Sequence, residues 1–421
     1  MRRKNKGEAQ GPSLWTRDFT IITLGSVVSM FGNAMSGFAL SLLVLDYTKS
    51  SFFYALVIAL FTAPNLIMPI FSGAILDRFS RKRTIYTLDF LSAGLYAVSA
   101  MLFAAGKFPY LALPLFAVIL GSIQSIYMVA YQSFYPLLIT EGNYTKAYSI
   151  SGVLETLSVF MVPLSAFLYN QIGIAPLLGI NAVSFLVAAV METQIKAEEA
   201  YIEKQKETRT QESHGRQMLS DIREGFRYMM SERGLLAIGI YFTFSAFAGG
   251  ASAVIVLPYF KNTFEGGEYL YMTVFGLSVV GRALGGMYHY RRKMPPERKF
   301  SIAMFVYVAI CFLEGGVLYA PVGVMRAMMF CSGILSVTSY TIRIAATQHY
   351  VPDEKKGRFN GAFNLLNTVG SLSGELIAGA LATWLESRLV LAGFMAVNLL
   401  AAFVILGRRK EEVAAIYNVE T

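Results

Sequence analysis

A short charged segment separates two long apolar stretches, and the types and spacing of its residues suit an electrostatic contact between helices. The carboxylate of Asp77 is followed by the cations Arg78, Arg81 and Lys82. A carboxylate can accept the unpaired backbone N–H groups at the N-terminus of a neighbouring helix, where the helix dipole also favours an anion. Gly73, four residues earlier, would let two helices approach closely. The alternative is a plain basic loop without a bound partner.

Carboxyl groups inside apolar segments could carry protons, because a lone buried carboxyl group can exchange a proton near neutral pH. Glu375 is the first candidate, since it has no evident partner and ends a polar stripe at helical spacing. Glu155 is the second. Asp89 is a third, but it lies near Arg81 and Arg83, and bracing that loop is its favoured alternative role. The stripe before Glu375 consists of Asn360, Asn364, Asn367 and Ser371.

Depth along the apolar segments predicts one ion pair and places a second pair of opposite charges at equal depth. Glu314 and Arg326 lie six residues on either side of the turn at Ala320, and we expect them to pair near one membrane surface. Glu155 and Arg282 each lie about eight residues, or about 12 Å, from the opposite surface. The alternative for Arg282 is to extend alone towards that surface.

The composition shows which elements must position these groups. The 421 residues are 55% hydrophobic and 15% charged, and the mean hydropathy is +0.50. That is too little polar surface for a soluble globule of this length. Apolar runs of about 20 residues cross the hydrocarbon core as helices, whereas barrel strands are shorter and alternate. We therefore expect an all-α membrane protein in contact with the lipid bilayer.

The sequence predicts twelve membrane spans, six in each half of the chain. Their predicted bounds are Phe19 to Leu45, Ser51 to Leu76, Thr84 to Ala105, Pro109 to Tyr135, Ala147 to Asn170, Ile172 to Met191, Leu235 to Phe260, Tyr269 to Tyr290, Phe300 to Ala320, Pro321 to Gln348, Arg358 to Leu385 and Leu389 to Leu406. The expected organisation is an N-terminal six-helix half (1–191), a linker (192–233), a C-terminal six-helix half (234–406) and a tail (407–421).

The basic residues predict the orientation. Of the 36 Lys and Arg residues, 29 lie on the side that holds both termini, 4 lie on the other side, and the rest lie within spans. By the positive-inside rule, both termini are cytoplasmic, and the expected location is the plasma membrane. The net charge of +9 then reflects topology, and we expect no nucleic-acid partner. Cys311 and Cys331 lie within spans without a second ligand at metal spacing, so we expect no disulfide, metal or other cofactor.

The linker contains an amphipathic segment at 218–230. Its apolar residues fall on one helical face and Arg223 and Arg227 fall opposite. Such a helix is expected to lie on the inner membrane surface.

The two halves of the chain share a faint repeat. The segment from Gly73 to Arg83 recurs as Gly285 to Lys293, with His289 at the position of Asp77. At the same offset, the segment from Val44 to Lys49 matches Val256 to Lys261. A duplicated six-helix unit follows from these matches.

Together these features resemble the major facilitator superfamily. The resemblance rests on twelve spans in two halves, a central loop, and the pattern Gly-x-x-x-Asp-Arg-x-x-Arg-Lys that begins at Gly73. The segment Arg223 to Tyr228 and the segment Val351 to Arg358 are similar to its macrolide-efflux-like and siderophore-exporter-like branch. The family pattern usually has a second glycine where this chain has Ser80.

The resemblance implies roles for the residues named above. It implies that Asp77 binds the start of span eleven, near Gly357 and Arg358, and latches the halves in the outward-facing state. It also places spans five and eight side by side, where Glu155 and Arg282 would pair. The substrate cavity would lie between spans one, four, seven and ten. Its candidate lining residues are Asn33, Gln124, Met128, Tyr131, Tyr241, Phe244, Tyr340, Asn364 and Asn367.

The expected function is a monomeric secondary active transporter that exports small amphipathic organic compounds by proton-coupled antiport. The aromatic and amide side chains suit an amphipathic small-molecule substrate better than a sugar or a phosphate. Span four lacks the Arg of the proton-antiporter pattern, and span five keeps Pro163 without its flanking glycines. Alternatives are an importer or lipid transporter of the same fold, or a membrane sensor or scaffold. No nucleotide-binding motif or nucleophile–base pair is visible, so an enzyme is not expected.

Overall fold

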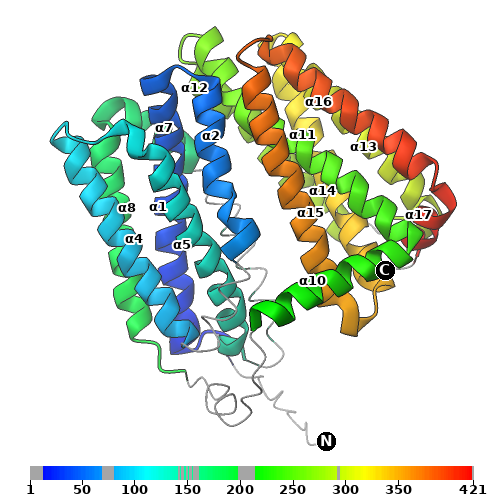
Figure 1. The fold of residues 1–421 in the computed structure, drawn as a ribbon, viewed down its shortest axis with the longest axis horizontal. Coiled ribbons are helices and arrows are strands. Elements are labelled where there is room, and N and C mark those ends of the chain that lie inside the picture. Colours follow the sequence, from blue (N-terminus) through cyan, green and yellow to red (C-terminus); the bar gives the residue numbers. More distant parts are fainter. Residues whose placement is uncertain are drawn as a thin grey trace, which may run out of the picture. The chain divides into compact units, whose positions relative to one another are not determined.

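The computed structural model describes residues 13–68, 80–140, 143, 147, 150, 154, 161–197, 214–291 and 294–419. These residues form helices joined by short turns, with no strand among them (Figure 1). Most of the membrane-crossing elements are single long helices, which leave few backbone groups without an internal partner.

The helices are numbered as in Figure 1. The first part of the chain supplies α1 (Arg17–Thr48), α2 (Ser51–Thr62), α4 (Arg81–Ala104), α5 (Leu113–Phe134), α7 (Met161–Ile172) and α8 (Ile174–Thr193). The second part supplies α10 (His214–Ser231), α11 (Arg233–Thr263), α12 (Gly267–Arg291), α13 (Lys299–Gly316), α14 (Val322–Tyr350), α15 (Asp353–Leu381), α16 (Ser387–Ala401) and α17 (Lys410–Tyr417).

Ten of the described helical segments are long and apolar enough to cross a membrane. They correspond to ten of the twelve predicted spans. Predicted span five is described at Ala147, Ile150 and Leu154 and from Met161 onwards, where it forms α7, and span two is described as far as Met68. Predicted span eleven is the 29-residue helix α15, whose polar stripe makes it less apolar than the others.

The described chain divides into two compact units. The first comprises Met1–Leu40, Ser72–Phe108 and Ile123–Gln211, as far as these are described, and the second comprises Ser41–Phe71, Pro109–Ser122 and Glu212–Thr421. The second unit therefore includes α2 and the adjoining end of α1, because α2 packs against α15 and α11.

Serine side chains cap two of the N-terminal helices. Ser50 accepts a hydrogen bond from the Phe53 amide at 3.2 Å and begins α2. Ser80 accepts one from the Arg83 amide at 3.1 Å and begins α4. A serine at this position satisfies one of the free N–H groups of the first turn. Ser80 thus has a local function of its own at the position where the family pattern usually has glycine.

Glycines allow the close packing of α11 against α15. A methyl group at Gly250 would overlap the carbonyl oxygen of Ser371, and one at Gly374 would overlap the carbonyl oxygen of Phe247. Small residues of this kind let helix backbones approach closely in membranes, where the hydrophobic effect does not drive helix association.

Helix α10 packs part of its apolar face on protein, and its expected position on the inner membrane surface stays a prediction. Figure 1 shows α10 crossing the lower part of α15. Met229 is fully buried in the core of the second unit, and Phe226 packs against that core. At Gly225 there is no room for a side chain beside the carbonyl oxygen of Arg358. Met230 remains exposed. The periodicity identified the helix but not the surface that it covers.

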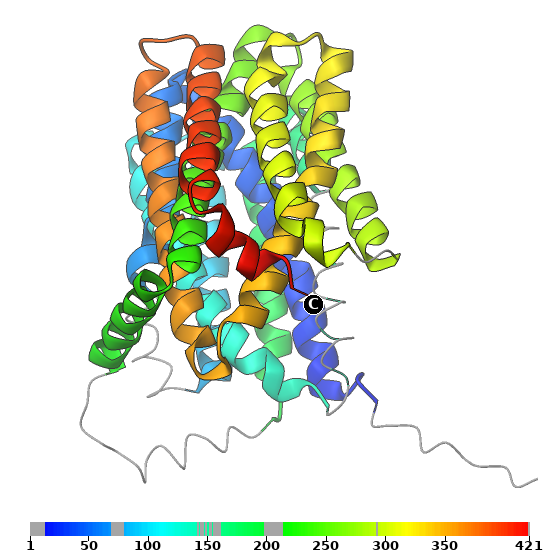
Figure 2. The same cartoon turned by 90° about the vertical axis from the view of Figure 1, so that its right-hand side faces the viewer.

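The C-terminal segment ends in a docked helix, α17, which Figure 2 shows turning away from the line of α16. Val413, Ile416 and Tyr417 are buried in the core of the second unit. The hydroxyl groups of Tyr417 and Tyr307 lie 3.0 Å apart, and Lys299 donates to the carbonyl oxygen of Val419 at 2.6 Å. These contacts fix the end of the chain against α13.

Candidate functional site

The first unit contains a cavity of about 150 Å³ that four predicted residues line together. Asn33 on α1 and Gln124, Met128 and Tyr131 on α5 all face it. Further lining residues, which the sequence did not single out for the cavity, include Ser26, Ser29, Met30, Asp89, Ser92, Tyr127 and Phe185. The lining therefore combines amide and hydroxyl groups with aromatic and thioether surfaces.

Neighbouring side chains hold the polar groups of this cavity in place. Asn181 is fully buried and donates to Ser36 at 2.6 Å and to the side-chain oxygen of Asn33 at 3.4 Å. Tyr131 stacks between two aromatic rings, those of Tyr127 and Tyr135, with centroid distances of 6.0 and 5.2 Å. Fixed amide and aromatic groups can orient a ligand with polar and apolar parts.

The remaining candidate lining residues belong to the second unit and are described within it. Tyr241 is 2% exposed and packs against Tyr307 at a centroid distance of 4.7 Å, so it is a core residue rather than a cavity residue. Phe244 and Tyr340 are exposed, and Asn364 is exposed while Asn367 is half-buried. An aromatic stripe at helical spacing fits core packing and a cavity wall equally, which explains the error for Tyr241.

Arg343 is a cation of the second unit that is surrounded by aromatic rings. Its guanidinium group lies over the rings of Phe242 and Phe363, at 4.9 and 4.8 Å from their centroids, and near that of Tyr340 at 5.5 Å. Aromatic faces stabilise a cation in a desolvated site. The sequence placed Arg343 within a span, but its aromatic partners come from three different helices and could not be identified.

Two carboxyl groups meet in the first unit. Asp89 on α4 and Glu192 on the last turn of α8 are 1% and 0% exposed, respectively. Their carboxyl groups lie within hydrogen-bonding reach of each other, and none of the four oxygens accepts a hydrogen bond from a described donor. Asp89 therefore does not brace the basic loop. Arg81 and Lys82 donate instead to the carbonyl oxygens of Ser133 and Ile195, each at 2.9 Å.

Glu375 is a buried carboxyl group of the second unit, 4% exposed. One of its oxygens accepts a hydrogen bond from Ser371 at 3.0 Å, and the other has no described partner. Farther along the polar stripe of α15, Asn360 accepts a hydrogen bond from Gln348 at 2.9 Å. Part of the stripe therefore serves helix packing.

The predicted ion pair between Glu314 and Arg326 is wrong. Glu314 accepts a hydrogen bond from Ser332 at 2.6 Å, whereas Arg326 donates to Thr273 at 3.2 Å. Ser332 and Arg326 are six residues apart on α14, which places them on different faces of that helix. Equal depth therefore did not bring the two charges together. Arg282 instead lies where its charge acts on Glu314.

Several residues of the predicted latch lie outside the described residues, namely Gly73, Asp77 and Arg78, and so does Glu155. Within the described part, Arg358 forms an ion pair with Glu224 of α10 at 2.6 Å, and a methyl group at Gly357 would meet nothing within 4 Å. His289, the counterpart of Asp77 in the repeat, forms a hydrogen bond with Thr338 of α14 at 2.7 Å.

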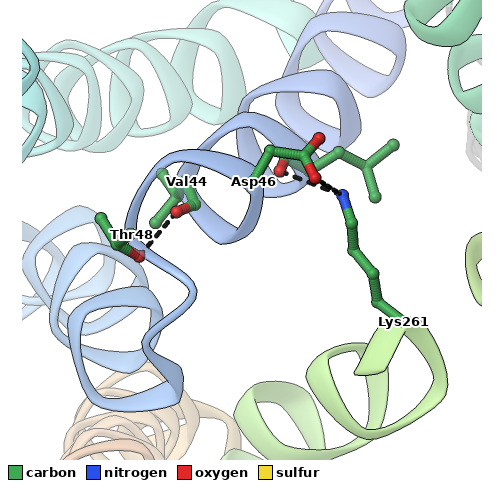
Figure 3. Close-up of polar contacts among 5 residues, drawn as sticks. Val44, Asp46, Thr48 and Lys261 are labelled. Atoms are coloured by element: carbon green, nitrogen blue, oxygen red, sulfur yellow. Dashed lines mark hydrogen bonds and ion pairs between the residues drawn. The ribbon is translucent and has the colours of Figure 1, made fainter. Parts of the chain in front are cut away.

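A further ion pair joins the end of α1 to the end of α11 (Figure 3). The ammonium group of Lys261 lies 2.6 Å from Asp46, and it also donates to the carbonyl oxygen of Leu42 at 3.4 Å. The side chain of Lys261 is 17% exposed and that of Asp46 is 46% exposed. The sequence had placed Lys49 and Lys261 at equivalent repeat positions but did not predict this pair.

Comparison with known proteins agrees with this architecture. The family model described as Major Facilitator Superfamily matches residues 22–375. The "Uncharacterized MFS-type transporter YkuC" of Bacillus subtilis (strain 168) is 22% identical over 332 residues, which are 76% of each chain. The "Uncharacterized MFS-type transporter YvqJ" of the same organism is 20% identical over 94% of this chain and 93% of its own.

A solved structure, that of a mutant of the nucleoside transporter NupG, superposes with a TM-score of 0.63 at 15% identity. The match covers 93% of this chain and 98% of the NupG chain. At this identity the similarity shows the fold alone.

Proposed function

Because the chain belongs to the Major Facilitator Superfamily, we propose that it is a secondary active exporter of small amphipathic organic compounds, driven by protons through alternating access. The family and the apolar helices make it a multi-pass membrane transporter of small molecules rather than an enzyme. Export, the substrate class and proton antiport are the parts that we propose.

The side chains that line the first-unit cavity support an amphipathic substrate. Gln124 and Asn33 offer amide groups, and Tyr131 and Met128 offer apolar surface beside them. At about 150 Å³ the cavity is smaller than the about 300–1,000 Å³ of typical ligand pockets. It would therefore hold one part of a ligand, in keeping with a binding site near the membrane midplane between two repeats.

The remaining architecture is proposed as follows. Residues 1–191 and 234–406 form the two moving halves, joined by the linker 192–233, and 407–421 form the C-terminal segment. Both termini are cytoplasmic, the protein lies in the plasma membrane, and it works as a monomer. Asp77 latches the halves in the outward-facing state by binding the start of span eleven near Gly357 and Arg358, and Arg78, Arg81 and Lys82 hold the loop. Glu155 pairs with Arg282.

Transport in proteoliposomes tests the proposal. The purified protein is reconstituted, and the uptake of a panel of fluorescent amphipathic compounds is measured with an imposed pH gradient of either sign and without one. We expect uptake by inside-out oriented protein only when the lumen is acidic. Flux in the opposite direction would indicate an importer, lipid scrambling would indicate a lipid transporter, and no flux for any compound would favour a sensor or scaffold.

Replacing Gln124 by Leu is expected to weaken substrate binding without unfolding the protein, since the residue lines the cavity. Loss of one hydrogen bond to a neutral group costs about 0.5–1.5 kcal/mol, so KM should rise about 2- to 13-fold. Leu115→Ala is the control, because Leu115 lies on the same helix and is exposed on its outer surface. An unchanged KM for the Gln124 variant would exclude the cavity as the binding site.

A further inference from the structure

Asp89 and Glu192 place two buried carboxyl groups side by side in the first unit. Both side chains are buried, at 1% and 0% exposure, and their carboxyl groups lie within hydrogen-bonding reach. Two ionised carboxylates in direct contact repel each other, and one of two such groups normally keeps a proton. An unpaired buried charge inside a membrane protein is also costly.

The surroundings offer hydroxyl groups but no described counter-charge. Ser26 on α1 and Tyr127 on α5 have buried hydroxyl groups that lie within hydrogen-bonding reach of each other. Tyr127 is the titratable group that faces both carboxyl groups from another helix. No described Lys or Arg acts on either carboxyl group, and the nearby cations Arg81 and Lys82 are bound to backbone carbonyl groups.

The pair is closed on one side and reaches the cavity on the other. Gly25 of α1 packs against Glu192, since a methyl group there would lie 3.3 Å from one carboxyl oxygen. Asp89 lines the cavity together with Gln124 and Tyr131. A proton held by the pair can therefore reach the cavity through Asp89.

We propose that Asp89 and Glu192 form the proton-binding site of the transporter, holding one proton between their two carboxyl groups and exchanging it with the cavity. In the loaded form one carboxyl O–H donates to the other carboxylate, and the pair carries a charge of −1. Release breaks that O–H bond, transfers the proton to water in the cavity, and leaves two carboxylates with a charge of −2. The hydroxyl group of Tyr127, which faces both carboxyl groups, can donate to a carboxylate after release.

This site rests on the proposed function for its role, but it can be tested without substrate. The infrared spectrum of the full-length protein in lipid is recorded at neutral and alkaline pH for the native protein and for the double variant Asp89→Asn/Glu192→Gln. The difference between the two proteins should contain one protonated carboxyl band at neutral pH, and that band should disappear at alkaline pH. Glu386→Gln, which removes an exposed carboxyl group, should leave the band in place.

Two results would overturn the inference. One is a difference spectrum with two carboxylates at neutral pH, and the other is loss of the band on adding Na⁺ at constant pH, which would make this a sodium site.

Transport measurements distinguish failure of the proton site from failure of the proposed exporter function. Gradient-driven flux that survives in the double variant would refute this site but not the exporter. A titrating band in a protein without gradient-driven flux would refute the exporter but not the site. If both proposals are right, the double variant should exchange substrate across the membrane but should not accumulate it against a concentration gradient.

Discussion

Gly374→Ala is expected to destabilise the protein, although it adds only one methyl group. The new Cβ would overlap the carbonyl oxygen of Phe247, a backbone atom that cannot move without displacing α11. Overpacking of a tight core costs about 1–3 kcal/mol, and sometimes more. Because α11 and α15 also pack closely at Gly250, pushing the helices apart at Gly374 would disturb their packing over several turns.

The matched control lies on the same helix. At Gly361 a methyl group would meet nothing within 4 Å, so Gly361→Ala should instead stabilise the helix by about 0.5–1 kcal/mol through the reduced freedom of the unfolded chain. Thermal unfolding in detergent would show the two variants moving the midpoint in opposite directions. A Gly374 variant as stable as the Gly361 variant would mean that α11 and α15 do not pack as described.

The amino-acid sequence was sufficient to predict the helices but not their mutual contacts. Apolar runs of the required length correspond to ten described segments. The reason is that backbone N–H and C=O groups in lipid must be hydrogen-bonded within the protein, which a long helix achieves. Contacts between side chains of two helices also depend on which face each helix turns towards the other. Glu314 and Arg326 have equal depth but lie against different residues, Ser332 and Thr273.

Glu192 illustrates why part of the candidate site could not be predicted. It ends an apolar run and begins a charged one, so the sequence assigned it to the linker. The helix, however, continues to Thr193. Helical side chains lean towards the N-terminus, which directs the Glu192 carboxyl group back into the bundle, where it is fully buried. In contrast, Asn33, Gln124, Met128 and Tyr131, which the sequence grouped together, line one cavity, because positions 124, 128 and 131 share one face of a single helix.

Lys261→Met is expected to shift the transporter towards the state in which the Thr48 end of α1 and the Thr263 end of α11 are apart. In the structure Lys261 joins these ends through Asp46 and the carbonyl oxygen of Leu42 (Figure 3). If the two six-helix halves rock as proposed, this pair is made when the side opposite the termini is closed and is broken when it opens. A partly exposed ion pair contributes about 1 kcal/mol at most, which would change the ratio of open to closed populations about fivefold.

Spin labels at Lys107 and Glu265, both exposed, would report the ratio as two distance populations in lipid nanodiscs. The repeat supplies a control, since Lys49 occupies the equivalent position in the other half and is exposed, so Lys49→Met should leave the ratio unchanged. Lys261→Asp should open the protein further, because it places two carboxylates together, and adding Asp46→Lys should restore the native ratio. If the exchange of charges fails to restore it, the loss of packing by the lysine chain, rather than the charge, sets the equilibrium. High salt should then leave the native ratio unaltered, whereas a contribution from the ion pair would weaken as salt screens it.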